Sequence, residues 1–293
     1  MTVLLISSRR TWGCMAILLA SVSMATTAVH AGSLSLDLVG SVRYDDNLNR
    51  AQRGSERQED GILTVSTDGS YRVQVTTNSG LIATLGLETE VHANIGDLDV
   101  IRAKTSLTYL IQPFPGFSAP WFALTAAFQL DEYSASDIRD GTVASFAAEA
   151  GKRFTDRIAA RLGYEVRDRD PSGKRVFKQH QNLFHVIGDY RVTDRIGAYL
   201  KYEYLDGGVV TTAARNMRFR GVARSFWRDR AFGSGMVAWR LDGHTHAFRL
   251  GGKYVLAKHT ALDLAATHAR TDADGDNKWN VWSVGLTVSH RFQ

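Results

Sequence analysis

The chain has 293 residues, and its 35 lysine and arginine residues outnumber its 30 aspartate and glutamate residues, for a net charge of +5 at pH 7. Aromatic residues make up 10% of the sequence and 26 residues are glycine, whereas only 4 are proline, which favours strands over helices or disorder. No run of about 18 apolar residues follows residue 31, and this excludes membrane-spanning helices from that part of the sequence.

The first 31 residues have the layout of a secretory signal peptide. Two arginines precede an apolar stretch over 15–28, and Val-His-Ala at 29–31 places small or tolerated residues before a cleavage site. The apolar stretch is short and interrupted by Ser and Thr, which disfavours the alternative of an N-terminal membrane anchor. Cleavage after Ala31 predicts a secreted chain over 32–293, and it would remove Cys14, the only cysteine, so that no disulfide can form.

Alternation of apolar and polar residues is the dominant pattern of the remaining sequence. It is clearest over 34–44, 81–91 and 101–111, and the segments 158–166 and 196–204 are near copies of each other. A period of two is typical of strands with one apolar and one polar face. Such strands form either a soluble β-sandwich, which buries the apolar faces, or a membrane barrel, which turns them toward lipid.

The connections between these strands alternate between tight turns and longer polar loops. The tight turns are expected at 77–79, 155–157, 193–195 and 257–259. The longer loops are expected at 45–60, 92–98, 133–140, 168–177, 206–235 and 271–278. Short periplasmic turns and long external loops produce this rhythm in outer-membrane barrels, and a sandwich has no reason to keep it.

We therefore predict an all-β fold, a closed antiparallel transmembrane β-barrel of about 12 strands over 32–293. The segment 206–243 leaves two interpretations. It is either one long external loop followed by a strand entering near Met236, or it contains an extra hairpin of 217–227 and 235–241, which gives 14 strands. We favour 12, because the segment is rich in arginine and has no clean apolar face.

The last predicted strand spans 279–292 and is rich in aromatic residues. Its apolar face is formed by Trp282, Val284, Leu286, Val288 and Phe292. This face resembles the C-terminal signal that the barrel assembly machinery of the outer membrane reads, although Gln293 occupies the final place. We expect that machinery to be a partner during insertion.

Three segments carry a family resemblance: 42–51 (VRYDDNLNRA), 206–212 (DGGVVTT) and 238–243 (AWRLDG). They resemble segments of poorly characterised proteobacterial outer-membrane β-barrel proteins, and the resemblance spans all of 32–293. The first segment is also similar to the barrel part of surface lipoprotein assembly modifiers and of some exopolysaccharide-locus barrels. The periplasmic helical-repeat domain of those modifiers has no counterpart in this sequence. The resemblance implies a location in the outer membrane of a Gram-negative cell, among lipid and lipopolysaccharide.

In a barrel, the polar faces of the strands line the lumen, and here they carry charges of both signs. The candidate pore-lining residues are basic Arg102, Lys104, Arg161, Arg167, Lys201, Arg249 and Lys253, and acidic Glu88, Glu90, Glu149, Glu165 and Glu203. Further bases on the same faces include Arg72, Arg153 and Arg191. In an open pore such charges set ion selectivity. In a narrow barrel they pair across the lumen and close it, and the balance of signs leaves both possibilities open.

A basic loop is the strongest local anomaly of the sequence. It contains Arg215, Arg218, Arg220, Arg224, Arg228 and Arg230, with few acidic residues nearby. On an external loop these arginines could contact lipopolysaccharide phosphates, which the guanidinium group fits well. Folded inward they would constrict the pore and favour anions. The third possibility is a solvated basic loop.

The sequence gives little support for metal binding, enzyme activity or nucleic-acid binding. The aspartates over 272–276 have the spacing of a calcium loop, but Asn277 and Ser283 replace the required Gly and Glu, so we predict no metal site. No histidine lies in a recognisable nucleophile motif, so we predict neither an enzyme nor a cofactor. The basic charge is dispersed along strands, which argues against nucleic-acid binding.

The function that these patterns favour is a porin-like passive channel for small hydrophilic solutes, anions among them. The first alternative is a non-channel barrel that supports envelope integrity or the export of a surface polymer or lipoprotein. The second alternative is an outer-membrane enzyme built on the histidine, serine and acidic residues of the chain.

Overall fold

The computed structural model describes residues 32–215 and 217–292, and the side chains of 217 and 218 are not described. The predicted signal peptide over 1–31 therefore lies outside the described residues, as does Gln293. Within the described part of the chain, no helix is both long and apolar enough to cross a membrane.

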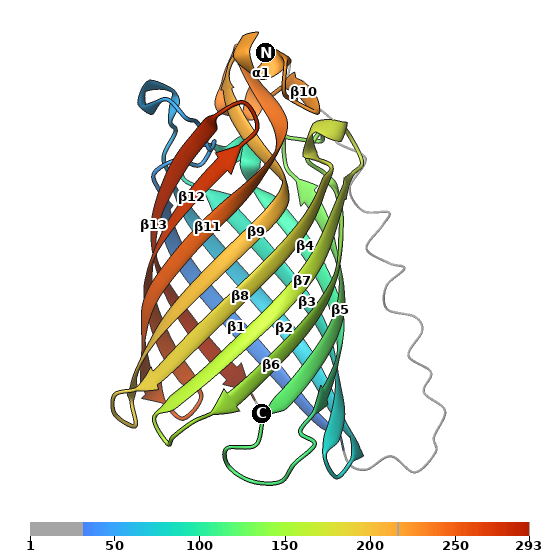
Figure 1. The fold of residues 1–293 in the computed structure, drawn as a ribbon, viewed down its shortest axis with the longest axis vertical. Coiled ribbons are helices and arrows are strands. Elements are labelled where there is room, and N and C mark those ends of the chain that lie inside the picture. The colour runs from blue at the N-terminus through green and yellow to red at the C-terminus, as the bar shows by residue number, and fades with distance from the viewer. Residues whose placement is uncertain (1–31, 216, 293) are drawn as a thin grey trace, which may run out of the picture. The chain divides into compact units, whose positions relative to one another are not determined.

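Thirteen strands form one sheet, and twelve of them close into an antiparallel transmembrane β-barrel (Figure 1). The twelve are β1 (Ser33–Asp45), β2 (Asp60–Thr76), β3 (Ser79–His92), β4 (Val100–Ile111), β5 (Trp121–Tyr133), β6 (Gly141–Arg153), β7 (Ile158–Pro171), β8 (Gln179–Arg191), β9 (Ile196–Ala214), β11 (Met236–Ala257), β12 (Thr260–Ala273) and β13 (Asn277–Phe292). Each strand pairs with its neighbour in the chain, and β13 pairs with β1 from Leu36↔Phe292 to Asp45↔Ser283. The ring has no free edge, which is what a sheet in lipid requires.

The predicted count of twelve spanning strands is confirmed, and the alternative of 14 is wrong. The thirteenth strand, β10 (Ser225–Arg228), has only four residues and pairs with Val237–Arg240 of β11 beyond the end of β12. It overlaps the first strand of the extra hairpin that the alternative required, at 217–227. It does not cross the membrane, because its partner residues belong to the part of β11 that extends past the barrel wall.

The outer face of the barrel explains why alternating sequences form its wall. Large apolar side chains are exposed on every one of the twelve strands, for example Leu34 (72%), Leu250 (65%) and Ile101 (62%). In water so large an exposed apolar surface would be a liability, whereas in lipid it matches its surroundings. The polar residues that alternate with them point into the barrel.

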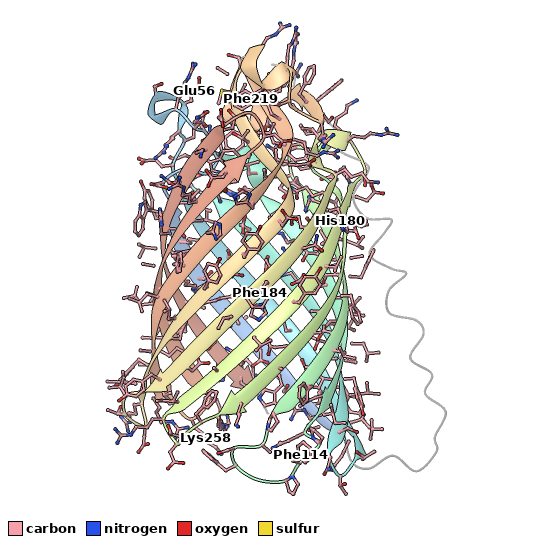
Figure 2. All side chains as sticks on the ribbon, viewed as in Figure 1. Glu56, Phe114, His180, Phe184, Phe219 and Lys258 are labelled. Carbon is pink, nitrogen blue, oxygen red and sulfur yellow. The ribbon has the colours of Figure 1, made fainter. Side chains whose placement is uncertain are left out.

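The two ends of the barrel differ. The end that we name the turn end carries the connections 77–78, 112–120, 154–157, 192–195 and 258–259. The opposite end, named the loop end, carries 46–59, 93–99, 134–140, 172–178, 215–235 and 274–276. Figure 2 places Glu56 and Phe219 at the loop end, and Phe114 and Lys258 at the turn end.

Two connections depart from the predicted alternation of short and long. The connection 112–120 at the turn end is long, and 274–276 at the loop end is short. Three of the four prolines of the chain, Pro113, Pro115 and Pro120, lie in the first of these connections. Proline cannot donate to a strand ladder, so β4 and β5 end before the turn can become tight.

Candidate functional site

The interior of the barrel is the candidate site, and strand pairing shows which residues face it. Residues directly opposite each other in an antiparallel pair lie on the same face of the sheet. Glu88 lies opposite Arg102, Gly86 opposite Lys104, and Lys201 opposite Arg249. By this register the twelve candidate pore-lining residues are all on the inner face, as are Arg72, Arg153 and Arg191.

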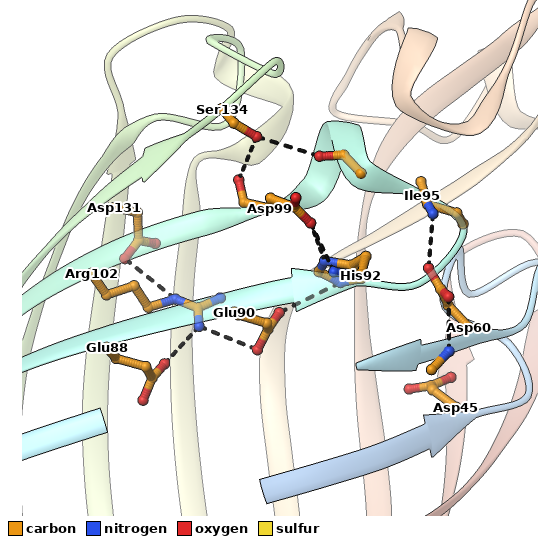
Figure 3. Close-up of polar contacts among 12 residues, drawn as sticks. Asp45, Asp60, Glu88, Glu90, His92, Ile95, Asp99, Arg102, Asp131 and Ser134 are labelled. Atoms are coloured by element: carbon orange, nitrogen blue, oxygen red, sulfur yellow. Dashed lines mark hydrogen bonds and ion pairs between the residues drawn. The ribbon is translucent and has the colours of Figure 1, made fainter. Parts of the chain in front are cut away.

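The inner face of β3, β4 and β5 holds a dense charge network, which Figure 3 shows in close-up. Arg102 donates to Glu88 Oε1 at 2.6 Å and to Glu90 Oε2 at 3.3 Å, and its Nε lies 3.8 Å from Asp131. Lys104 Nζ donates to Glu88 Oε2 at 2.5 Å. Arg102 lines the mid-barrel cavity, but the carboxylates of Glu88, Glu90 and Asp131 neutralise its charge.

Arg169 belongs to this network and was missed by the sequence analysis. Its Nη1 donates to Asp131 Oδ2 at 2.5 Å, and its Nη2 donates to the main-chain oxygen of Arg139 at 2.6 Å. The prediction assigned residues 168–177 to a loop, but β7 continues to Pro171. The alternation of Glu165, Arg167 and Arg169 on one face was the signal that could have identified it.

The network continues to the loop end and fixes the loop 93–99. The ring of His92 lies between two carboxylates: its Nε2 is 3.6 Å from Glu90 Oε1, and its Nδ1 is 3.6 Å from Asp99 Oδ1. His92 is 7% exposed. Asp99 Oδ1 accepts the main-chain N–H of His92 at 2.7 Å. The buried carboxylate of Asp60 accepts the main-chain N–H of Ile95 at 3.0 Å (Figure 3). These bonds satisfy the loop backbone that barrel pairing cannot reach.

Most other candidate bases also have carboxylate partners. Tyr199 Oη donates to Asp263 at 2.9 Å, and Arg249 contacts both, at 3.1 Å from Tyr199 and 3.4 Å from Asp263. The remaining pairs are Arg161 with Asp189 at 3.6 Å, Arg167 with Glu165 at 3.0 Å, Lys201 with Glu203 at 2.8 Å, and His185 with Glu149 at 3.2 Å. Most of the charged side chains inside the barrel are therefore neutralised by an ion-pair partner.

Four inward-facing bases near the turn end, together with Arg43 of β1, are the exceptions. Within the described ranges, no carboxylate lies within 4.0 Å of Arg72, Arg153, Arg191 or Lys253. Arg153 instead packs over the ring of Phe117 at 5.4 Å, and Lys253 lies 5.1 Å from the ring of Tyr199. Unneutralised positive charge is thus concentrated at the turn end of the lumen.

Three cavities follow one another along the inner face of β3. The first, about 210 Å³, lies at the loop end beside Glu90 and His92. The second, about 540 Å³, lies at mid-barrel beside Thr84, and the third, about 710 Å³, reaches the turn end beside Ile82 and Gly80. The lining of the middle cavity is polar, with glutamine, serine, threonine and charged side chains. A row of three cavities therefore runs along one wall of the barrel, and its middle member is polar-lined.

A hairpin tip covers the loop end of this row. Residues 209–213 of β9 and 237–241 of β11 pair with each other, and Thr211, Thr212, Ala238 and Trp239 are at most 3% exposed. One face of the tip packs on Trp279 and Val281 of β13, and the other on Val176 and Phe177. Strands buried on both faces lie within the mouth of the barrel instead of forming its wall.

The tip replaces the first part of the external loop predicted over 206–235, residues 206–214, and 215–235 remains a loop. The strand near Met236 begins where it was expected, but β9 extends to Ala214. Gly207 permits the strand to bend there, since its φ is +134° and an added Cβ would lie 2.2 Å from the carbonyl oxygen of His180. The alternation ends at this point because both faces become buried.

Loops from three sides of the ring hold the tip in place. Arg139 of the loop 134–140 forms an ion pair with Asp229 of the loop 215–235, and the two side chains are 8% and 0% exposed. Thr212 Oγ1 also donates to Asp229 at 2.8 Å. From the loop 46–59, Asn49 Nδ2 donates to the main-chain oxygen of Thr212 at 2.9 Å. Four strands separate each of these loops from the next around the ring, so the contacts converge over the mouth.

The predicted basic loop divides into two groups. Arg224 Nε donates to Asp242 at 2.7 Å, and this bond raises the pKa of the Arg224 guanidinium. The other described members line a cavity of about 710 Å³ between the loops 134–140 and 215–235, and they are Arg215, Arg220, Arg228 and Arg230. The side chain of Arg218 lies outside the described part of the chain.

The predicted assembly signal lies on the outer face of β13, along the seam with β1. Trp282, Val284, Leu286, Val288 and Phe292 are between 42% and 55% exposed toward the membrane.

The acidic segment 272–276 is engaged by its neighbours. Asp272 lies 3.2 Å from Lys278 and 3.6 Å from Arg270. Among the residues that the structure describes, no group of three or more histidine, cysteine or acidic side chains could hold a metal ion.

Comparison with known proteins identifies the fold. No family model and no curated protein matches the sequence. An outer membrane channel from Pseudomonas putida F1 aligns with a TM-score of 0.57 and 11% identity, covering 92% of this chain and 97% of that chain. The CymD monoaromatic hydrocarbon channel aligns with a TM-score of 0.46, 9% identity and coverage of 89% and 88%. The KdgM porin in complex with disordered oligogalacturonate aligns with a TM-score of 0.42, 12% identity and coverage of 88% and 99%.

These similarities are to outer-membrane β-barrels and, at such identities, they concern the fold alone. The finer resemblance to surface lipoprotein assembly modifiers stays a prediction.

Proposed function

We propose that this chain is an outer-membrane barrel that acts as a passive channel for small hydrophilic solutes, with its loop end facing outward. The observation that carries the proposal is the row of cavities beside β3, from His92 at one end to Gly80 at the other, with a polar and charged lining at mid-barrel. A barrel needed only as a scaffold gains nothing from a polar-lined cavity in its middle. The proposal includes cleavage of a signal peptide after Ala31 and insertion by the barrel assembly machinery.

The unpaired positive charges at the turn end of the lumen are expected to make the channel selective for anions. Arg72, Arg153, Arg191 and Lys253 have no carboxylate partner among the described side chains, so their positive charge acts on passing ions. Arg102 and Lys104, although they face the lumen, are neutralised by Glu88 and Glu90. The selectivity of the channel is therefore expected to depend on the turn-end bases.

A planar-bilayer recording with the purified protein tests both statements. The folded protein should give steady conductance with a mild anion preference in a salt gradient. Replacing Arg72, Arg153 and Arg191 with Gln should move the reversal potential toward cations. The control is Arg270→Gln, which removes the same kind of charge from the outer face of β12 and should leave the reversal potential unchanged. Silence of correctly folded protein would overturn the channel.

The closed loop end favours a second candidate function. Its buried ion pair, Arg139 with Asp229, and the two-sided packing of the hairpin tip suit a barrel that does not conduct but supports the envelope or the export of a surface polymer. A silent bilayer together with loss of envelope integrity in a deletion strain would favour this candidate. An enzymatic role has no comparable observation in its favour.

A further inference from the structure

The cavity between the loops 134–140 and 215–235 lies outside the row of lumenal cavities. It measures about 710 Å³, and the arginines that line it are Arg215, Arg220, Arg228 and Arg230. Arg228 and Arg230 flank Asp229, which is turned away into the buried ion pair with Arg139. The cavity therefore adjoins the contact that holds the hairpin tip closed.

The charge of this cavity is strongly positive. Among the described side chains, no carboxylate lies within 4.0 Å of any of its four arginines. Among the described lining residues Asp137 is the only acidic one, so their four positive charges face one negative charge, a net of +3. Arginines without partners at a concave surface attract an anion and can bind a carboxylate through two parallel hydrogen bonds.

The rest of the lining is mainly apolar and aromatic. Phe226 and Trp227 are 48% and 45% exposed, but as neighbours in β10 they point to opposite faces of the strand. The ring of Trp227 is covered by Lys174, whose Nζ lies 4.0 Å from its centroid, whereas Phe226 packs on buried Trp239 with ring centroids 5.1 Å apart and lies 5.9 Å from Arg220. Among the described lining residues, only Ser136 and Asp137 offer side-chain oxygens that could accept hydrogen bonds from a ligand. A sugar carries many hydroxyl donors and would leave most of them unpaired here, whereas a flat apolar ring can stack on the exposed ring of Phe226.

We infer that this cavity binds a small organic anion with a flat apolar ring, an aromatic carboxylate, with the ring against Phe226 and the carboxylate on Arg228, which shares the face of Phe226 in β10, and on Arg230. The inference rests on the proposed channel function, since it makes the cavity the capture site for a solute at the outer mouth. Lipopolysaccharide phosphates are the less favourable occupants, because Ala135–Ile138 and Trp227 enclose the cavity between loops that converge over the mouth.

Calorimetric titration of the folded protein in detergent with benzoate tests the site directly. Benzoate should bind, and its neutral analogue benzamide should bind at least about tenfold more weakly. Arg228→Gln and Arg230→Gln should each weaken benzoate binding about tenfold, since each removes a charge-assisted hydrogen bond. The matched control is Arg224→Gln, which changes the charge of the same loop by the same amount at a residue paired with Asp242 and outside the cavity. It should change the affinity less than twofold.

The result that overturns the site is absence of benzoate binding by folded protein, or equal weakening by Arg224→Gln and Arg228→Gln. Glucuronate or inorganic phosphate binding as tightly as benzoate would overturn the aromatic part of the inference. Phe226→Leu keeps an apolar contact to Trp239 but should weaken benzoate binding, and unchanged affinity would contradict stacking. Conductance is measured separately in bilayers, so a silent protein that binds benzoate refutes the channel alone. A conducting protein that does not bind it refutes the capture site alone.

Discussion

At the scale of single residues, the sequence predicted which side chains face the lumen but not which ones neutralise each other. The period of two places Arg102 and Glu88 on the inner face, because alternation is a local property. Partnership depends on which strands become neighbours. Arg139 and Asp229 are 90 residues apart, and nothing in the local pattern of either loop indicates that they meet.

The pair Arg139–Asp229 gives a prediction at this scale. Asp229→Asn leaves the buried guanidinium of Arg139 without a counter-ion, which costs about 3–5 kcal/mol where one partner of a buried pair is removed. We expect the cost to appear as release of the hairpin tip, seen as faster amide hydrogen exchange over 211–213 and 237–241.

The control for this variant is Arg224→Gln, which breaks an exposed ion pair with Asp242 and should leave amide exchange over the hairpin tip unchanged. Unchanged exchange over the hairpin tip in Asp229→Asn would show that the ion pair does not hold the tip.

At the scale of elements, prediction succeeded where a strand has one face in lipid and failed where it has none. The twelve strands of the wall alternate because only one of their faces contacts lipid. The tip of β9 and β11 does not alternate, since Thr211 and Thr212 on opposite faces are both buried. The tip therefore cannot be told from the arginine-rich loop that follows it by sequence alone. Only the packing of the tip on Trp279 and Phe177 shows that it is a pair of strands.

The seam between β13 and β1 carries the prediction at this scale. Phe292 pairs with Leu36 at the turn end and is 48% exposed on the outer face. We expect Phe292→Ser to reduce the amount of protein in the outer membrane severalfold, because an unclosed sheet edge cannot remain in lipid. Quantitative blotting of outer-membrane fractions measures the loss.

Leu250→Ser is the matched control for the seam. Leu250 is more exposed, at 65%, but lies in β11, away from the closing strand. If both variants insert equally well, the apolar face of β13 has no special role in assembly.

At the scale of the whole molecule, the alternation of turns and loops predicted the closed barrel, which the structure confirms, and the orientation in the membrane stays a prediction. The structure places the loops 46–59, 93–99, 134–140, 172–178 and 215–235 at one end. The connection 112–120 is the one long segment at the other end, and its prolines account for it. The proposed orientation can be tested with a protease, because arginines occur at both ends.

Trypsin added to intact cells should cut the chain at the loop end alone. Arg53 in the loop 46–59 has a side chain that is 67% exposed, held only by a 3.6 Å contact to Glu56. Arg157 and Arg195 are also exposed, in short turns, so a protease that reached them could cut there, but they lie at the opposite end. With the loop end outward, Arg53 is the one of these three sites that the protease can reach, and the two turn sites become accessible after the outer membrane is permeabilised. Fragment masses identify each cut, and cleavage at Arg157 or Arg195 in intact cells would reverse the orientation. The capture site on the loop 215–235 would then face the periplasm.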